Sequence, residues 1–398
     1  MTIFRIGHGS DGPARTADVT RQAMTKLSIC IPVETATQDV LPLVTLLLEK
    51  PSENFEIVIA KPADVALPGA IAELAADSAP IVIADVAAGS TRQHLWRHAV
   101  SATKGDWVTL VNPGDVIESD LATMVAFLET TSPNVDALAW NAFQIDRHAE
   151  PGNASSVAIP ASYHIEKLDK TIMLKAFFYW ENSLNSPKMP FGLYHAAIRR
   201  SLLDALLQLP ELQDWSTPVP QYEWAAKVLL FANELAFCAR PMSAINLVPF
   251  SAEPPLHPWN FPFHSGLGIA GAVAEVQFHV LRELDTPWSG GGEAFVRALM
   301  IDCMMETSRE AYKNKGNAYF AALKEFEGGH LAPFFRPEFH EVRQKDHRRG
   351  LHDGVLLIDR FVAGARDATE FYTTVRLMMA PVELICGGAL YSKDTKAA

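Results

Sequence analysis

Hydrophobic residues in the first third of the chain form short continuous runs that alternate with segments of helical spacing. The runs are rich in β-branched residues and cover Leu27–Pro32, Phe55–Ala60, Ile81–Ala84 and Trp107–Val111. Apolar residues recur at helical spacing in residues 40–50, 70–76, 91–102 and 119–128. This alternation predicts an α/β fold in which a mostly parallel, Rossmann-related sheet is covered by helices on both faces.

The loops at the carboxyl ends of the predicted strands are the expected ligand site, because open α/β sheets bind ligands there. These loops follow Pro32, Ala60, Ala84 and Val111. None of them contains a GxGxxG or GxxxxGK[ST] phosphate loop. The ordinary dinucleotide fold and the P-loop nucleotide hydrolases therefore lose support.

The pattern becomes less regular after residue 130 and changes again near residue 254. Strands are predicted at 136–146 and 235–247, a strand edge leading into a helix at 192–207, and a helix at 222–232. Residues 254–263, rich in proline, tryptophan and phenylalanine, are typical of a linker, and helices are predicted beyond them at 267–285, 292–314, 316–327 and 355–380. We therefore divide the chain into a leader (1–26), an α/β domain (27–250), and a linker with a helical C-terminal region (251–398).

Charge and cysteine content narrow the classes of function. The chain has 34 basic and 46 acidic residues, a formal net charge of -12, so we expect no nucleic-acid partner. Its 4 cysteines are far apart and lack metal-ligand spacing, which is typical of buried free thiols in a reducing compartment. The first residues do not resemble a signal peptide, and no run approaches about 18 apolar residues, so we expect a cytoplasmic protein without a transmembrane segment.

The strongest local signal for chemistry is the segment Asn112-Pro113-Gly114-Asp115, which follows a buried strand. A carboxylate there can hold Mn²⁺ or Mg²⁺ against a diphosphate, because these cations bind through one or two carboxylates plus substrate phosphates. The same residues also suit a turn in which Asp115 caps the next helix. The spacing alone leaves both interpretations open.

Three segments resemble the family 2 glycosyltransferases, which have the GT-A fold, and they occur in the family's order. Those enzymes have a strand of the type SIVIP, then a segment EIVVVDD, and then a glycine before a strand that ends in an acidic metal motif. This chain has LSICIPVE (27–34), EIVIAKPAD (56–64) and KGDWVTLVNPGDVIESD (104–120). Residues 220–224 (PQYEW) stand where the family often has EDW, and 235–241 resemble its returning strand. The resemblance spans residues 27–247 and implies a GT-A-like fold for them.

The resemblance implies an inverting hexosyltransferase of polysaccharide biosynthesis. Its donor would be a UDP- or GDP-sugar and its acceptor a saccharide or a lipid-linked molecule, the latter with peripheral contact to a membrane. Glu223 would be the general base that deprotonates the acceptor hydroxyl, and Asp115 would bind Mn²⁺ or Mg²⁺. The implied nucleotide-binding positions are Pro32, Val33, Glu34, Lys61, Asp64, Arg92 and Asn112.

Three positions depart from the family pattern. Lys61 stands where the family has an acid that contacts the base, and Asn112 replaces the first acid of the metal motif. The family's arginine–asparagine stretch is not recognisable near Arg92 and Arg97. These departures leave open an alternative, a catalytically inactive glycosyltransferase-like protein that binds a glycan, a nucleotide or a partner enzyme. An unrelated α/β nucleotide enzyme is disfavoured by the missing phosphate loops.

Several polar residues have both a structural and a functional interpretation. Glu223 is either the base or a solvated glutamate at the start of a helix, and Arg92 either contacts phosphate or lies on a helix surface. His195 is a lone histidine that either approaches the acceptor or packs within the fold. A modest basic cluster suits either a solvated face or an anionic acceptor; it comprises Arg343, Lys345, Arg348 and Arg349.

Overall fold

The structure is a computed structural model of the whole chain. It describes residues 25–50, 54–77, 79–153, 156–188, 191–208, 217–247, 260–284, 286–340, 346–387 and 391–392. The predicted leader up to residue 24, the domain boundary at residue 250 and most of the predicted linker lie outside the described residues. The division into domains therefore stays a prediction.

Ten strands of the described chain form one mixed sheet, in the order β13-β8-β10-β6-β9-β4-β1-β2-β3, with β5 paired to β10. Four parallel strands form one end of this sheet: β1 (Leu27–Pro32), β2 (Phe55–Pro62), β3 (Ile81–Val86) and β4 (Trp107–Leu110). The others are β5 (Val116–Ile117), β6 (Val135–Ile145), β8 (Ile165–Leu168), β9 (Ala196–Arg199), β10 (Glu234–Asn246) and β13 (Tyr391–Ser392). β9 lies antiparallel between β4 and β6, and β6 pairs with β10 in parallel. The predicted α/β class with a mostly parallel mixed sheet is confirmed.

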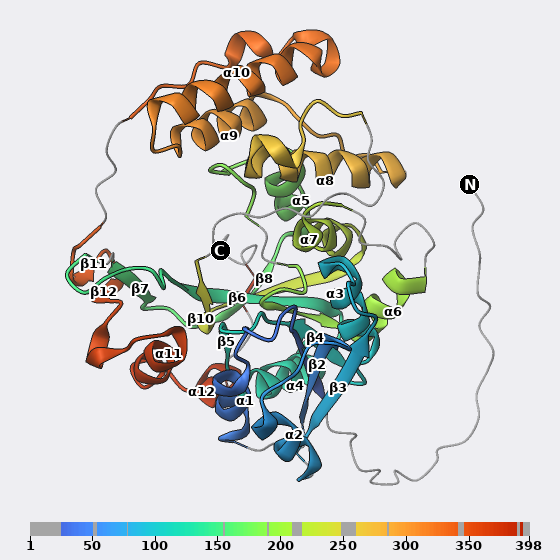
Figure 1. Cartoon of the computed structure of the whole chain (residues 1–398), viewed down its shortest axis with the longest axis vertical. Helices are drawn as coiled ribbons and strands as arrows, with labels where there is room; N and C mark the ends of the chain where they lie inside the picture. Colours follow the sequence, from blue (N-terminus) through green and yellow to red (C-terminus); the bar gives the residue numbers. More distant parts are fainter. Residues whose placement is uncertain are drawn as a thin grey trace.

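Helices cover both faces of the sheet, as Figure 1 shows. One face packs against α1 (Leu41–Leu48), α2 (Gly69–Ala76) and α4 (Leu121–Thr131). The other face packs against α3 (Arg92–Ser101), α5 (Lys170–Phe178), α6 (Arg200–Gln208) and α7 (Pro220–Phe231). Every residue of β1 and β4 is buried, which is why these strands are continuous apolar runs without alternation.

The strand order places a ligand crevice between β1 and β4. Chain order runs outward from β1 to β2 and β3, and α3 then returns the chain to the other side of β1. At such a reversal the loops leave the carboxyl ends of the two central strands in opposite directions, and this opens a crevice. The loops after Pro32 and Leu110 therefore border the expected ligand site.

A buried hydrogen-bond cluster joins the amino ends of the same strands, opposite the crevice. We call Lys26, Ser28, Glu56, Lys104 and Gly105 the amino-edge cluster. Glu56 Oε1 accepts hydrogen bonds from Ser28 Oγ at 2.6 Å and from the backbone N–H groups of Lys104 (2.5 Å) and Gly105 (3.1 Å), and its Oε2 lies 3.3 Å from Lys26 Nζ. A Cβ at Gly105 would lie 2.5 Å from Ser28 Oγ and 2.8 Å from Lys26 O, so this contact requires glycine.

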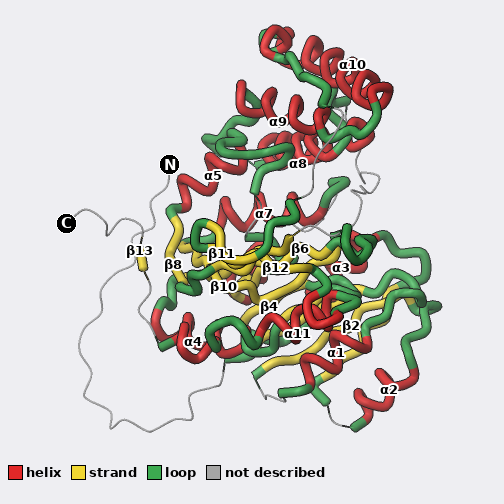
Figure 2. Tube along the Cα trace, turned by 90° about the vertical axis from the view of Figure 1, so that its left-hand side faces the viewer, coloured by secondary structure: helices red, strands yellow, loops and turns green. Residues whose placement is uncertain are grey.

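The predicted helical C-terminal region is confirmed between residues 269 and 325. α8 (Ile269–Glu283), α9 (Glu293–Met304) and α10 (Arg309–Glu325) stack outside α5 and α7, as both views show (Figure 1, Figure 2). The helix predicted over 292–314 is divided, because Ser308 caps a new helix by accepting a hydrogen bond from the N–H of Ala311 at 3.1 Å. No helix in the described ranges is long and apolar enough to cross a membrane.

The helix predicted over 355–380 is wrong in its first part. Residues Val355–Asp359 form strand β12, which pairs antiparallel with β11 (Gly350–His352) and β7 (Ser156–Pro160). Asp353 (φ 49°) and Gly354 (φ 76°) are both left-handed, as a tight hairpin turn requires. Only the later part is helical, in α11 (Ala368–Arg376), which α12 (Val382–Cys386) follows.

Residues 372–380 are held against the α/β sheet by hydrogen bonds to a buried ion pair. Arg240 pairs with Glu118 through both terminal nitrogens, and its Nε donates to the carbonyl of Ala380 at 2.9 Å. Tyr372 OH on α11 donates to Glu118 Oε2 at 2.7 Å. The C-terminal segment thus supplies part of the packing of the first domain.

Candidate functional site

A charged pair from two loops lies at the carboxyl edge of the sheet, where the strand order predicts the crevice. Glu34 follows β1, and Arg92 begins α3, so both lie at the carboxyl edge of the sheet. Their side chains form a two-point ion pair, with Arg92 Nε 2.8 Å from Glu34 Oε1 and Nη2 3.3 Å from Oε2. Both side chains are about one-third exposed, at 29% and 33%, so a ligand can reach them.

The other predicted nucleotide contacts lie along the same edge. Pro32 and Val33 are buried, and the N–H of Val33 donates a hydrogen bond to the carbonyl of Ala60 at 2.8 Å. Lys61, at the end of β2, forms a 2.7 Å ion pair with Asp85 on the neighbouring strand β3. Asp64 is exposed on the turn after β2. This edge therefore has a carboxylate on β3, paired with the lysine that precedes the last residue of β2.

Asp115 is the centre of a buried hydrogen-bond cluster. Its Oδ2 accepts from Tyr194 OH at 2.6 Å and lies 3.4 Å from His195 Nε2. Its Oδ1 accepts from the backbone N–H of Asn246 at 2.8 Å and from the Asn246 side chain at 3.3 Å. We call Asn112, Asp115, Tyr194, His195 and Asn246 the Asp115 cluster; it joins the loop after β4 to the residues before β9 and to the end of β10.

Tyr194 connects this cluster to the charged pair. Burial and the adjacent Asp115 carboxylate raise the pKa of Tyr194 well above its ordinary value, so the phenol stays protonated and donates. The side chain of Asn112 hydrogen-bonds Tyr194, and the charge of Arg92 also acts on the phenol. The ring of Tyr194 also stacks on Trp96 of α3, with ring centroids 6.1 Å apart.

His195 is held in an unusual backbone conformation beside Asp115. Its φ of 52° is left-handed, which side chains larger than glycine rarely adopt. The backbone is fixed there because the N–H of His195 donates to the carbonyl of Leu110, at the end of β4, at 3.0 Å. Its Nδ1 is buried and has no hydrogen-bond partner in the described parts of the chain. Strain of this kind is found most often where a side chain is held for a ligand.

The donor set around Asp115 does not fit a divalent cation. A carboxylate offers about four lone-pair positions, and the four contacts from Tyr194, His195 and Asn246 occupy both oxygens. Over the described ranges, no group of three or more His, Cys, Asp or Glu side chains is arranged to hold a metal ion. Mn²⁺ or Mg²⁺ at Asp115 would have to displace hydrogen-bond donors.

Glu223 lies near the site but is enclosed by its own neighbours. Its Oε2 accepts from the Thr217 N–H at 3.0 Å and from Thr217 Oγ1 at 2.7 Å, and its Oε1 pairs with Lys227 one turn along α7. Gln93, next to Arg92 on α3, donates to the carbonyl of Thr217 at 3.3 Å, so this cluster connects to the crevice. The side chain of Glu223 has no exposed surface, and its predicted role as base stays a prediction.

Sequence reasoning missed several members of the site. Tyr194, Asn246 and Asp85 were not singled out, since Tyr194 and Asn246 lie 79 and 131 positions from Asp115 in sequence. The available signal is that the sequence predicts a strand edge at the start of 192–207 and a strand at 235–247.

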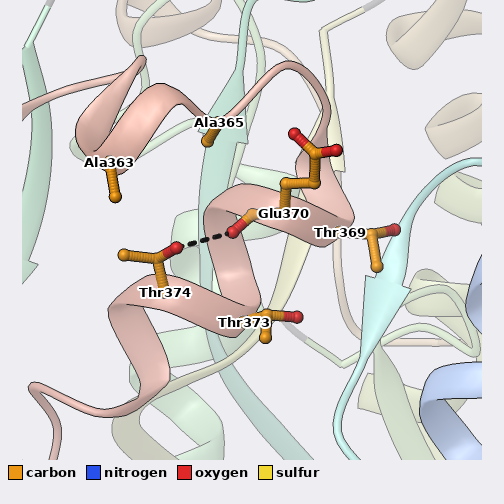
Figure 3. A pocket seen from close by; sticks show the side chains of 6 residues that line it. All are labelled: Ala363, Ala365, Thr369, Glu370, Thr373 and Thr374. Atoms are coloured by element: carbon orange, nitrogen blue, oxygen red, sulfur yellow. Dashed lines mark hydrogen bonds between the residues drawn. The ribbon is translucent and has the colours of Figure 1, made fainter.

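The other polar candidates lie away from the crevice. Of the basic cluster, Arg343 and Lys345 fall outside the described residues, Arg348 pairs with Asp346, and Arg349 pairs with Asp359. A surface hollow beside α11 is lined by short alanine and threonine side chains and by Glu370 (Figure 3). The Glu370 carboxylate there is paired with Arg366, and no residue of this hollow belongs to the crevice.

Comparison with known proteins finds solved structures of similar fold. No protein-family model matches the sequence, and no curated protein matches it. A similar solved structure is S. aureus TarS 1-349 in complex with UDP-GlcNAc, with a TM-score of 0.45 and 13% identity, covering 75% of this chain and 81% of that one. Another is the mannosyltransferase PcManGT from Pyrobaculum calidifontis in complex with GDP-Man and Mn²⁺, with a TM-score of 0.35 and 13% identity, covering 79% and 86%. At such scores, the function of this chain must be argued from its own residues.

Proposed function

We propose that this chain is a glycosyltransferase that binds a UDP- or GDP-sugar at the crevice and transfers the sugar to a saccharide or lipid-linked acceptor. The observation that carries the proposal is that Glu34, Arg92 and the Asp115 cluster meet where the strand order reverses. Ligands of open α/β sheets bind at that point.

The side chains along the edge suit the two halves of a nucleoside diphosphate. Arg92 can contact phosphate through its planar guanidinium, which matches phosphate oxygens at two points. Asn112 adds a neutral donor beside it. The base and ribose would lie along the loops after β1 and β2, where Glu34 and Asp64 are accessible and Pro32 and Val33 form the floor. Lys61 acts there through its pair with Asp85.

A divalent cation is not assigned a role in this proposal. The resemblance implies Mn²⁺ or Mg²⁺ at Asp115, but the hydrogen bonds to both carboxylate oxygens argue against it. Charge on the diphosphate is instead met by Arg92 and by the side-chain amide of Asn112.

Glu223 is the proposed base. In an inverting transfer, the acceptor oxygen bonds to the anomeric carbon while the bond from that carbon to the diphosphate breaks, and the base takes the hydroxyl proton. Glu223 can do this only if its carboxylate exchanges the Thr217 donors for the acceptor hydroxyl.

A second candidate is a catalytically inactive relative that binds a nucleotide, glycan or partner enzyme. The observation in its favour is that both oxygens of Glu223 are occupied by Thr217 and Lys227 within a fully buried setting. An ion pair of this kind stabilises a fold without any catalytic duty.

The test is nucleotide release from UDP- and GDP-sugars, combined with calorimetric binding. The variant is Glu223→Gln with Lys227→Met, because Glu223→Gln alone removes the negative charge that faces a buried ammonium. Glu234→Gln, whose side chain is 37% exposed, is the matched control. If Glu223 is the base, the double variant keeps donor affinity within about threefold and loses about 10²-fold or more in release, the usual contribution of a general base.

Each other outcome selects between the candidates. Binding without release by the native chain supports the inactive relative. Release that is unchanged in the double variant removes Glu223 from the mechanism. Failure of every nucleotide sugar to bind refutes the glycosyltransferase proposal.

A further inference from the structure

The hydrogen bonds around Asp115 identify what this carboxylate does. Its side chain is 5% exposed, and its four contacts come from three residues in two segments that are far apart in sequence. Each contact fixes a partner: Tyr194 and His195 before β9, and Asn246 at the end of β10. Removing the carboxylate would leave buried donors without an acceptor, which is costly in a water-poor setting. The carboxylate of Asp115 therefore holds the side chains of Tyr194, His195 and Asn246 in place.

Two of these neighbours offer polar atoms to a ligand. His195 has a buried Nδ1 without a hydrogen-bond partner in the described chain, and its left-handed backbone fixes the ring. The phenol of Tyr194 donates to Asp115, and the charge of Arg92 also acts on it. The ring planes of Tyr194 and His195 are nearly perpendicular, with centroids 4.4 Å apart, so each limits the movement of the other.

We infer that Asp115 is a positioning residue for Tyr194 and His195, and that the nucleotide is bound without a divalent cation at this carboxylate. The inference rests on the proposed function, because it concerns the same nucleotide site. It differs from the role that the sequence resemblance implies, in which Asp115 itself is the metal ligand. The physical reason is that donors from Tyr194 and Asn246 already bind both oxygens, and His195 Nε2 lies a further 3.4 Å from Oδ2.

The experiment measures UDP and GDP binding to the full chain by calorimetry, once in EDTA and once in MnCl₂. Binding of Mn²⁺ alone is followed in parallel by the loss of the free-ion electron paramagnetic resonance signal. The variants are Asp115→Asn and Tyr194→Phe, and Asp204→Asn on exposed α6 is the matched control. Thermal unfolding checks that each variant is folded, and Tyr194→Phe keeps the test valid if Asp115→Asn is not.

We expect the dissociation constant of the native chain to change less than threefold between the two buffers. Asp115→Asn and Tyr194→Phe should each weaken binding at least threefold, by the same factor in EDTA and in MnCl₂, whereas Asp204→Asn should not. A residue that serves only the fold would leave the affinity of a folded variant unchanged, so that result overturns the positioning role.

Two further results overturn the inference in ways that can be told apart. A gain of more than tenfold in affinity with MnCl₂ that is absent from Asp115→Asn makes Asp115 a metal ligand and leaves the proposed function intact. If Mn²⁺ binds to the native chain without nucleotide and this binding is lost in Asp115→Asn, Asp115 is likewise a metal ligand. If neither nucleotide binds in either buffer, the proposed function fails and this inference fails with it.

Discussion

Replacement of Glu56 tests the amino-edge cluster, the buried hydrogen-bond group that joins β1, β2 and the start of β4. Glu56 is 4% exposed, and its Oε1 is the shared acceptor for Ser28 Oγ and the N–H groups of Lys104 and Gly105. Glu56→Ala removes this acceptor, whereas Glu56→Gln keeps one oxygen in place and removes only the charge.

The expected losses follow from counting the donors that are left unpaired. After Glu56→Ala, the Gly105 N–H keeps Ser28 Oγ at 2.8 Å, but Lys104 N–H and the Ser28 hydroxyl lose their acceptor. An unsatisfied buried donor costs about 1–3 kcal/mol, so the loss of acceptor for two donors should lower the unfolding free energy by about 2–6 kcal/mol. Glu56→Gln should lose about 1–2 kcal/mol, because hydrogen bonds to a charged acceptor are about twice as strong as neutral ones.

The effect of Glu56 should also depend on pH. Burial acts to raise the pKa of Glu56, but the hydrogen bonds from Ser28 and Lys104 and the charge of Lys26 outweigh it and leave the pKa below its ordinary value. A carboxyl with a lowered folded-state pKa stabilises the fold above its unfolded pKa of about 4.3 and loses that effect as pH falls through the folded value. The unfolding free energy of the native chain should therefore exceed that of Glu56→Gln by a constant amount above about pH 6. Below about pH 4 the difference should be smaller.

The assay is urea unfolding followed by fluorescence and circular dichroism, at pH 7 and at several pH values down to the acid transition. Glu73→Gln, an exposed glutamate on α2, is the matched control and should be neutral. The reasoning is refuted if Glu56→Ala loses no more than this control. It is also refuted if the margin between the native chain and Glu56→Gln grows as the pH falls.

Three other variants or measurements test the rest of the packing. Gly105→Ala should cost about 2–3 kcal/mol, because its Cβ meets backbone atoms at 2.8 Å that cannot move away; a neutral urea midpoint contradicts this. Arg240→Met should lower the unfolding free energy by about 3–5 kcal/mol, because the buried Glu118 carboxylate loses its cationic partner. It should also speed proteolysis of the C-terminal segment, and equal rates of cleavage in both proteins would contradict this. Burial raises the pKa of Cys238 to about 12 and that of Cys386 to about 11. These thiols should therefore react slowly with a thiol reagent at pH 8, and the half-buried Cys386 should react before Cys238. A fast reaction at Cys238 contradicts this prediction.

The sequence was enough to predict the sheet, and the reason lies in its buried strands. Largely apolar runs such as 27–32 and 107–110, rich in β-branched residues, are typical of strands in a covered parallel sheet. The β12 hairpin was missed because a run of apolar residues at 355–358 was assigned to a helix, although the Asp353-Gly354 pair before it is a strong hairpin signal. Local pattern and turn chemistry therefore account for both the success and the error.

The chemistry of the site could not be predicted in the same way. Asp115 was recognised from its loop, but its contacts with Tyr194 and Asn246 depend on how β9 and β10 pack against β4. The burial of Glu223 likewise depends on Thr217 before α7 and on the cover that the helical C-terminal region provides. Contacts between segments that are distant in sequence produce no recognisable motif or residue spacing.

The amino-edge cluster also explains why the resemblance to glycosyltransferases predicts the fold better than the function. Ser28, Glu56 and Gly105 are members of the three matched segments, and they satisfy one another at the amino ends of the strands, with no ligand involved. Lys61 and Asn112, where the chain departs from the family, lie at the opposite edge. A change at the ligand edge leaves the amino-edge hydrogen bonds intact, so the fold can persist while the donor, the cation or the catalysis changes. Variants of Glu56 should therefore lower stability without altering the nucleotide affinity of the folded fraction, and Asp115→Asn should lower that affinity even in protein that stays folded.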